Sequence, residues 1–188
     1  MIRELVNKNR SIRRYDNSVK LDGKFLSELV DLGRICPNTG NRQRIRYATV
    51  CSEKALGAVR EILGFAAYLK DWDGPTAEEN PAAYIVLLSE DEDVNLFIDL
   101  GIAAQAILLG AVEAGYGGCI FRSFDKDKLS EILGVDGLAP RLVISLGVPA
   151  ERVELCEVEN GDIRYYRNAD GVHFVPKRSL SDVLVVQK

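Results

Sequence analysis

Three arginines and a serine crowd into five positions near the start of the sequence, at Arg10, Ser11, Arg13 and Arg14. The chain as a whole is acidic, with a formal net charge of -4. A guanidinium group offers paired N–H donors that suit a phosphate, and a serine hydroxyl adds a neutral donor. On one helix face these arginines would repel one another unless an anion joined them. The cluster could bind an anion, but taken alone it favours a solvated basic face over an anion site.

A second polar stretch, PNTGNRQ, covers residues 37–43. Its amide and hydroxyl groups could bind a ligand, and Gly40 would allow the backbone to approach that ligand closely; an ordinary polar turn is the alternative. Arginines then alternate at Arg42, Arg44 and Arg46. Alternating arginines are typical of a charged edge strand as well as of an anion site.

Other kinds of catalytic site have little support. A nucleophile paired with histidine could use only His173, the single histidine, which lies beside a predicted turn. The four cysteines lack C-x-x-C spacing, so we expect reduced, packed thiols and no metal site. The glycines of residues 110–118 end a helix, whereas a dinucleotide-binding loop follows a strand.

The acidic net charge argues against a general nucleic-acid or membrane-surface binder. The first ten residues are too polar for a signal peptide, and reduced cysteines fit a cytoplasmic protein. The longest apolar run, residues 94–116, contains Asp99, Gln105 and Glu113. We therefore expect a buried helix there and not a membrane span.

Helices and strands interleave along the chain. Apolar periodicity and capping residues predict helices over residues 2–9, 22–35, 52–63, 94–116 and 125–133. Buried or alternating apolar runs predict strands over residues 45–51, 82–89, 117–121 and 141–149. After Pro149, turn signals at Asn160-Gly161 and Asp170-Gly171 predict hairpins and an extended arm. The order favours one α+β domain over residues 1–188, with the hairpin and arm over about 150–188, and not a doubly wound parallel sheet.

Six motifs occur in an order that resembles the FMN-dependent nitroreductase family, especially its short single-domain members. The resemblance covers about residues 3–185. The family motif R-S-x-R-x-[FY] matches residues 10–15, and P-S-x-x-N-x-Q-P-W is followed in part over residues 37–45. The other four are a D-x-G helix opening at Asp99, D-x-x-x-L-x-x-[IL]-L-G over 125–134, L-G-x-P over 146–149 and a basic C-terminal motif over 171–180.

The resemblance implies a nitroreductase-like three-layer sandwich, in which helices flank a central, mostly antiparallel sheet and a C-terminal arm is exchanged with a dimer partner. It implies a homodimer with FMN at the interface and NADH or NADPH as electron donor. Hydride would pass in ping-pong fashion through flavin N5 to a nitroaromatic, a quinone or a similar small oxidant. The flavin carries the chemistry, so no catalytic side chain is required. The alternative is a flavin-binding dimer that stores or senses flavin without efficient turnover.

Motif positions also imply the cofactor contacts. The phosphate and the polar side of the flavin would be held by Arg10, Ser11, Arg13, Lys177 and Arg178. The loop that reaches across the dimer interface would supply Pro37, Asn38, Thr39 and Asn41. The flavin ring would lie beside Ile120, Phe121, Arg122 and Ser123.

The chain departs from the family pattern at Asn38, Arg44, Ile45 and Arg122, which concern the substrate pocket more than FMN binding. Arginines at 42, 44 and 46 that faced the flavin pocket could receive an NADPH phosphate, which would favour the enzyme over the flavin store. Arg14 lies outside the family motif, and we expect it to face water.

Overall fold

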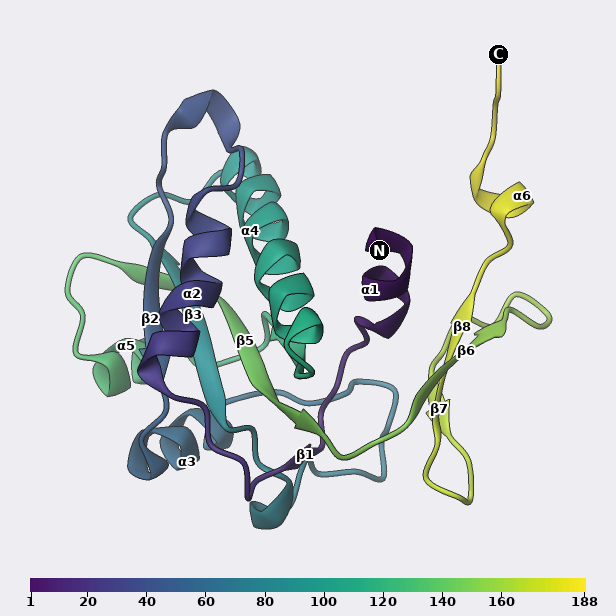
Figure 1. The fold of residues 1–188 in the computed structure, drawn as a ribbon, viewed down its shortest axis with the longest axis horizontal. Helices are drawn as coiled ribbons and strands as arrows, with labels where there is room; N and C mark the ends of the chain where they lie inside the picture. Colours follow the sequence, from purple (N-terminus) through teal and green to yellow (C-terminus); the bar gives the residue numbers. More distant parts are fainter. The chain divides into compact units, whose positions relative to one another are not determined.

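The computed structural model describes residues 1–188 and divides into two compact units (Figure 1). Unit 1 contains Met1–Gly64 and Pro75–Ala150, and unit 2 contains Phe65–Gly74 and Glu151–Lys188. The change of sequence character expected after Pro149 coincides with the boundary after Ala150. The single-domain organisation over residues 1–188 stays a prediction.

Unit 1 is built on a five-stranded antiparallel sheet with strand order β1-β5-β3-β2, in which β4 also pairs with β5. The strands are β1 (Tyr15–Asp16), β2 (Arg46–Val50), β3 (Ala83–Ser89), β4 (Gly117–Phe121) and β5 (Ala139–Pro149). The long β5 has β3 on one side, and both β4 and β1 on the other. The predicted antiparallel sheet is confirmed.

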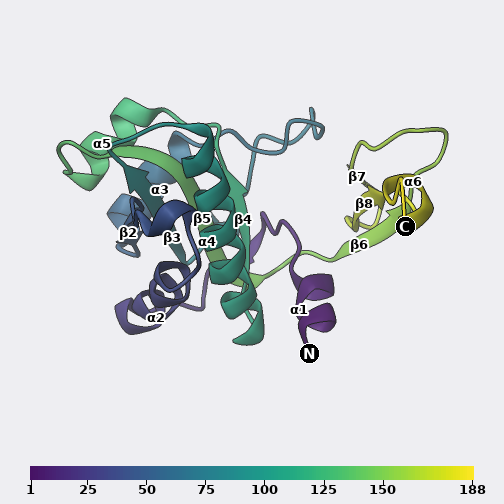
Figure 2. The ribbon, with the colours of Figure 1, turned by 90° about the horizontal axis from the view of Figure 1, so that it is seen from above.

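Helices cover both faces of this sheet, with α2 and α4 on one face and α3 and α5 on the other (Figure 2). Their bounds are α1 (Ile2–Lys8), α2 (Gly23–Arg34), α3 (Glu53–Glu61), α4 (Val94–Glu113) and α5 (Lys126–Leu133). Two short 3₁₀ turns, η1 (Thr39–Asn41) and η2 (Ala77–Glu79), lie in the connecting loops. The three-layer α+β architecture is therefore confirmed for unit 1.

The central strand β3 is buried over its whole length because both of its faces are covered. Successive side chains of a strand point to opposite faces of the sheet. Ala83, Ile85 and Leu87 belong to the main core with α2 and α4. The alternate residues Tyr84 and Val86 are also fully buried, on the face covered by α3 and α5. A continuous apolar run, rather than an alternating one, is the expected sequence for such a strand.

The helix α4 is the core helix of unit 1. By length and composition alone it could cross a membrane, but 44% of its most apolar window is buried inside the protein. Its buried side chains include Leu100, Ala104 and Ile107. On its other side Val94, Ile98 and Ile102, spaced four residues apart, are exposed. The expectation of a buried helix is confirmed for one side of α4, and an apolar stripe stays open on the other.

Two helices begin at the aspartates that the sequence suggested as caps. Asp22 accepts a hydrogen bond from the backbone N–H of Phe25 at 2.7 Å and starts α2. Asp125 does the same for Lys128 at 3.1 Å and starts α5. Such caps satisfy N–H groups that have no partner within the helix.

Two glycines allow close packing around β4, Gly117 against the chain after α1 and Gly118 against β5. A Cβ on Gly117 would approach the Ile12 side chain to 2.8 Å, and one on Gly118 would collide with the backbone carbonyl of Ser145. Since that carbonyl belongs to the central β5, it cannot move aside without disturbing the sheet.

We expect Gly118→Ala to lower the free energy of unfolding by about 2 kcal/mol through this overpacking. Urea unfolding followed by circular dichroism measures the change. Gly57→Ala in α3 is the matched control because a Cβ there meets open space. The control should be neutral or stabilising by up to about 1 kcal/mol. Equal stability of the two variants would contradict the assigned close approach.

Unit 2 contains a three-stranded sheet and one short helix, namely β6 (Val153–Glu157), β7 (Tyr166–Arg167), β8 (His173–Lys177) and α6 (Leu180–Val183). The Asp170-Gly171 turn joins β7 and β8 as an antiparallel hairpin, as predicted. The turn at Asn160-Gly161 closes only an isolated bridge, and β6 instead pairs with β8 in parallel. The purely hairpin-like reading of this region is therefore wrong.

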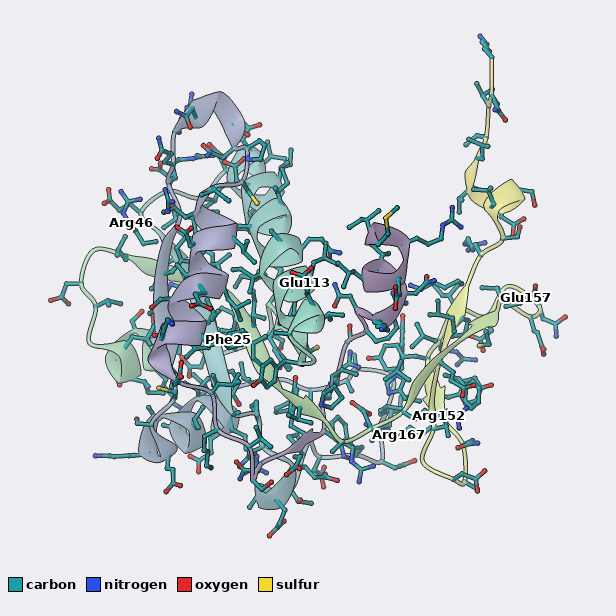
Figure 3. The ribbon with its side chains drawn as sticks, in the orientation of Figure 1. Phe25, Arg46, Glu113, Arg152, Glu157 and Arg167 are labelled. Atoms are coloured by element: carbon teal, nitrogen blue, oxygen red, sulfur yellow. The ribbon has the colours of Figure 1, made fainter.

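Residues 65–74 pack onto the strands of unit 2 through aromatic side chains. The guanidinium of Arg167, labelled in Figure 3, lies over the Trp72 ring, 4.4 Å from its centroid. The rings of Tyr68 and Tyr165 lie 5.0 Å apart. His173 is buried, with its ring 5.2 Å from that of Tyr165. These rings form an aromatic cluster within unit 2.

Candidate flavin-binding site

The first motif runs along the outer edge of β4. Ser11 forms a parallel bridge with Gly118, and the N–H of Ile12 donates to the carbonyl of Gly118 at 3.0 Å. Ile12 is buried and anchors this segment. The structure therefore brings Arg10, Ser11 and Arg13 beside the strand that holds Ile120 and Phe121 of the predicted flavin-ring contacts.

Arg10 has an incompletely satisfied guanidinium. Its Nη2 donates to the carbonyl of Val6 at 2.6 Å, while its Nε is buried and has no hydrogen-bond partner. Burial lowers the pKa of Arg10 from its usual value. Ser11 is exposed, and Arg13, half-buried, donates to the Ser11 carbonyl at 3.4 Å. A buried donor without an acceptor is costly, so this arginine is suited to an anion.

Arg14 does not face water as expected. It is half-buried, and its Nε donates to the Glu79 carboxylate at 2.6 Å. The partner lies 65 residues away in the short turn η2, so nothing local in the sequence indicated it. The arginine outside the family motif is thus held by an ion pair, in contrast to Arg10.

The strand β4 and the residues after it form the other side of this candidate site. Ile120 is 40% exposed, whereas Phe121 is buried. The exposed Arg122 lies with its guanidinium 4.5 Å from the centroid of the Phe97 ring. The Ser123 carbonyl accepts a hydrogen bond from the N–H of Gly64 at 2.8 Å. Beyond Gly118 no strand pairs with the outer edge of β4.

The second motif forms the loop between α2 and β2. The backbone N–H and the hydroxyl of Thr39 both donate to Oδ1 of Asp99, at 2.8 and 2.9 Å. Oδ1 of Asn38 accepts from the N–H of Gln43 at 2.9 Å. Pro37 and Asn41 are exposed, and Asn41 has a φ of 51°, which asparagine tolerates better than most residues. The loop is thus tied to α4 through Asp99, which the sequence reasoning had not assigned a role.

The alternating arginines of this loop have different environments. Arg44 turns inward, with its side chain 8% exposed, and its Nη1 donates to Asp93 at 2.8 Å. Its Nη2 lies 3.6 Å from Oδ2 of the buried Asp99. Arg42 and Arg46 are exposed. Arg44 is therefore committed to carboxylates within the protein, and only Arg42 and Arg46 are open to an outside anion.

Asp93 pairs with Arg44 and also caps α4, since it accepts a hydrogen bond from the N–H of Leu96 at 2.7 Å. The hydrogen bond from Arg44 lowers the pKa of Asp93 to about 2. A lowered pKa in the folded state means that the ionised carboxylate stabilises the fold above the unfolded pKa near 3.9, and that this stabilisation disappears as the pH falls through about 2.

We expect Asp93→Asn, which keeps a capping oxygen but removes the charge, to lose less stability on acidification than the wild type. Urea unfolding between about pH 5 and pH 2 measures both proteins. The two stability curves should converge at the acid end. Parallel curves over this window would contradict the assigned ion pair.

The basic pair of the C-terminal motif belongs to unit 2. Lys177 is the last residue of β8, and Arg178 follows it. Both side chains are exposed, and neither forms an ion pair. Ser179 then caps α6. These two cations are thus available for an anion.

Known proteins that are similar to this chain have the same fold. Residues 68–148 match the family model described as the Nitroreductase family. A nitroreductase family protein from Clostridium novyi NT is 22% identical, with a TM-score of 0.67 over 97% of this chain and 98% of that chain. A nitroreductase family protein from Streptococcus pneumoniae TIGR4 is 16% identical, with a TM-score of 0.71 over the full length of both chains.

A third structure of the same fold, from Exiguobacterium sibiricum 255-15, was solved in complex with FMN. It is 18% identical, with a TM-score of 0.66, and the match covers 80% of this chain and 89% of that chain. At these identities the structural likeness establishes the fold. Together with the matched segment, it confirms the resemblance to the nitroreductase family that the motifs suggested.

Proposed function

We propose that this protein is an FMN-dependent oxidoreductase that takes hydride from NADH or NADPH and passes it to a nitroaromatic, a quinone or a similar small oxidant. The observation that carries the proposal is the buried, partnerless Nε of Arg10, on a segment held against the open edge of β4. The Exiguobacterium protein of the same fold, which binds FMN, supports the choice of cofactor.

The residues of unit 1 fit the two ends of FMN. A phosphate is a dianion that needs cationic and neutral donors, and Arg10, Ser11 and Arg13 supply both kinds. A flavin ring needs an apolar surface beside backbone donors and acceptors. The exposed Ile120 and the unpaired edge of β4 provide such a surface. The cationic Arg122 side chain would charge the nearby pocket.

When bound, FMN supplies hydride transfer through its N5 atom, so the side chains only bind, orient and tune the cofactor. Arg10, Arg13, Lys177 and Arg178 would neutralise the phosphate and the polar side of the flavin. A cation such as Arg13 favours negative charge on the cofactor, which lowers the cost of accepting electrons. Pro37, Asn38, Thr39 and Asn41 would approach the flavin from the partner subunit.

We also propose that the protein acts as a homodimer in the cytoplasm, with FMN at the interface and the C-terminal arm exchanged between subunits. The exposed stripe Val94, Ile98 and Ile102 on α4 supports an interface. The tail also exposes apolar side chains, with Val185 at 92% and Val186 at 66%.

Sedimentation tests the dimer. Ile98→Glu places a charge in the stripe and should convert the dimer to monomers at micromolar concentration. Lys54→Glu, which places a negative charge at an exposed position on α3, is the matched control. A monomeric wild type would overturn the dimer proposal.

The activity itself is tested by steady-state oxidation of NADH and NADPH with menadione and with nitrofurazone as oxidants. The proposal expects turnover that requires added FMN and follows ping-pong kinetics. A protein that binds FMN yet turns over neither donor with either oxidant would be a flavin store.

A further inference from the structure

Unit 1 contains a cavity of about 630 Å³ between the end of α2, the loop after it and α4. This volume lies within the range of small-molecule binding sites. One wall is apolar and is formed by Val30, Ile45 and Ala103. The cavity can therefore receive the hydrocarbon part of a ligand.

The charges around the cavity are mainly positive. Four arginines line it, Arg34, Arg42, Arg44 and Arg46, against one carboxylate, that of Asp99. Asp99 and Asp93 neutralise Arg44. Arg34 pairs with Asp31 outside the cavity lining, at 2.6 Å. After these pairs are removed, two positive charges remain, that of Arg42 in the loop and that of Arg46 at the start of β2.

Neither of these two arginines has a carboxylate partner. The Arg42 side chain forms no hydrogen bond or ion pair. Arg46, labelled in Figure 3 at the start of β2, donates only to backbone carbonyls, including that of Gln43 at 2.7 Å. Its guanidinium therefore keeps N–H donors and its full charge for a ligand.

Two neutral donors, the Tyr47 hydroxyl and the Cys36 thiol, also line the cavity. The Tyr47 hydroxyl has no hydrogen-bond partner in the protein, and burial raises the pKa of Tyr47 to about 12, so it keeps its proton at neutral pH. The Cys36 thiol donates to the Leu32 carbonyl at 3.2 Å, and burial raises its pKa as well. The lining thus offers cations and neutral donors but no free anion.

We propose that this cavity is a second ligand site, which binds an organic anion. A carboxylate or phosphate group would bind Arg42 and Arg46, with the Tyr47 hydroxyl as a further donor and an aromatic or aliphatic body against Val30, Ile45 and Ala103. The arginines are distinct from the proposed flavin contacts, although Pro37 and Asn38 also line this cavity. The proposal does not depend on flavin binding or turnover.

Calorimetric titration of the purified protein at low salt, with and without added FMN, tests the site. The probes are 2-naphthoate, 2-naphthyl phosphate, their neutral analogue 2-naphthalenemethanol, and inorganic phosphate alone. We expect both organic anions to bind about tenfold or more tightly than the neutral analogue and than inorganic phosphate. If inorganic phosphate binds as tightly as naphthyl phosphate, the proposed apolar contacts of the ligand with the cavity wall are wrong.

The double variant Arg42→Gln/Arg46→Gln should weaken naphthoate binding about tenfold or more and leave the flavin content unchanged. Lys54→Gln, which removes an exposed charge on α3, is the control and should change neither. Ile45→Trp fills the cavity and should abolish naphthoate binding in a folded, flavin-loaded protein.

Equal binding of naphthoate and its neutral analogue would overturn the proposal, as would unchanged binding in the double variant. Loss of FMN from the double variant, or loss of naphthoate binding on FMN loading, would show that the cavity belongs to the flavin site. Failure to take up FMN would overturn the proposed function alone, because the naphthoate titration is still measured on the flavin-free protein.

Discussion

Arg10→Ala is expected to weaken FMN binding by about tenfold to a hundredfold, because each charge-assisted hydrogen bond contributes about 1.5–3 kcal/mol. Its Nε is buried without a partner, so it has little else to bind. Arg13→Ala should have an effect in the same range. Titration of the flavin-free variants with FMN, followed by flavin fluorescence, measures both losses, and circular dichroism checks that the variants are folded.

Arg14→Ala is the matched control for these variants, since it removes the same charge from the same segment. Arg14 is paired with Glu79, so its loss should lower thermal stability but leave FMN affinity within about twofold of the wild type. Full flavin occupancy in both Arg10→Ala and Arg13→Ala would contradict the assigned phosphate contacts.

Asp99→Ala is expected to lower the free energy of unfolding by about 3 kcal/mol. Asp99 is 3% exposed, and it accepts two hydrogen bonds from Thr39 while it faces the buried Arg44. Its removal leaves the Thr39 donors without an acceptor and a buried guanidinium with one fewer carboxylate. Urea unfolding measures the loss.

Asp91→Ala is the matched control, because Asp91 is also close to Arg44, at 3.9 Å, but is exposed. An exposed pair of this kind contributes less than about 1 kcal/mol. Similar losses for the two variants would show that burial does not decide the strength of these contacts. The loop over residues 37–44 should also become sensitive to proteolysis in Asp99→Ala and not in Asp91→Ala.

Much of unit 1 could be predicted because its signals are local. Asp22 and Asp125 cap helices within three residues of themselves, and the strand β4 follows its apolar run residue for residue. The helix α4 was recognisable as a buried element because polar residues interrupt its apolar run. These elements are determined by periodicity and capping, which a single sequence displays.

The contacts that shape the candidate sites could not be predicted because they join distant residues. Thr39 and Asp99 are 60 positions apart, and Arg14 and Glu79 are 65 apart. Likewise, β6 pairs in parallel with β8, although the turn signal at Asn160-Gly161 lies nearer to β6 in the sequence. In the same way, the motif order suggested which arginines hold FMN, but only the structure separated the partnerless Nε of Arg10 from the paired Arg14.

Anaerobic titration of the FMN-loaded protein with NADH and with NADPH tests the proposed function most directly. The proposal predicts that the visible absorption band of the bound flavin bleaches in proportion to one or both nicotinamides and returns when a quinone is added. A protein that cannot be loaded with FMN, or one that stays yellow with both nicotinamides, would contradict it.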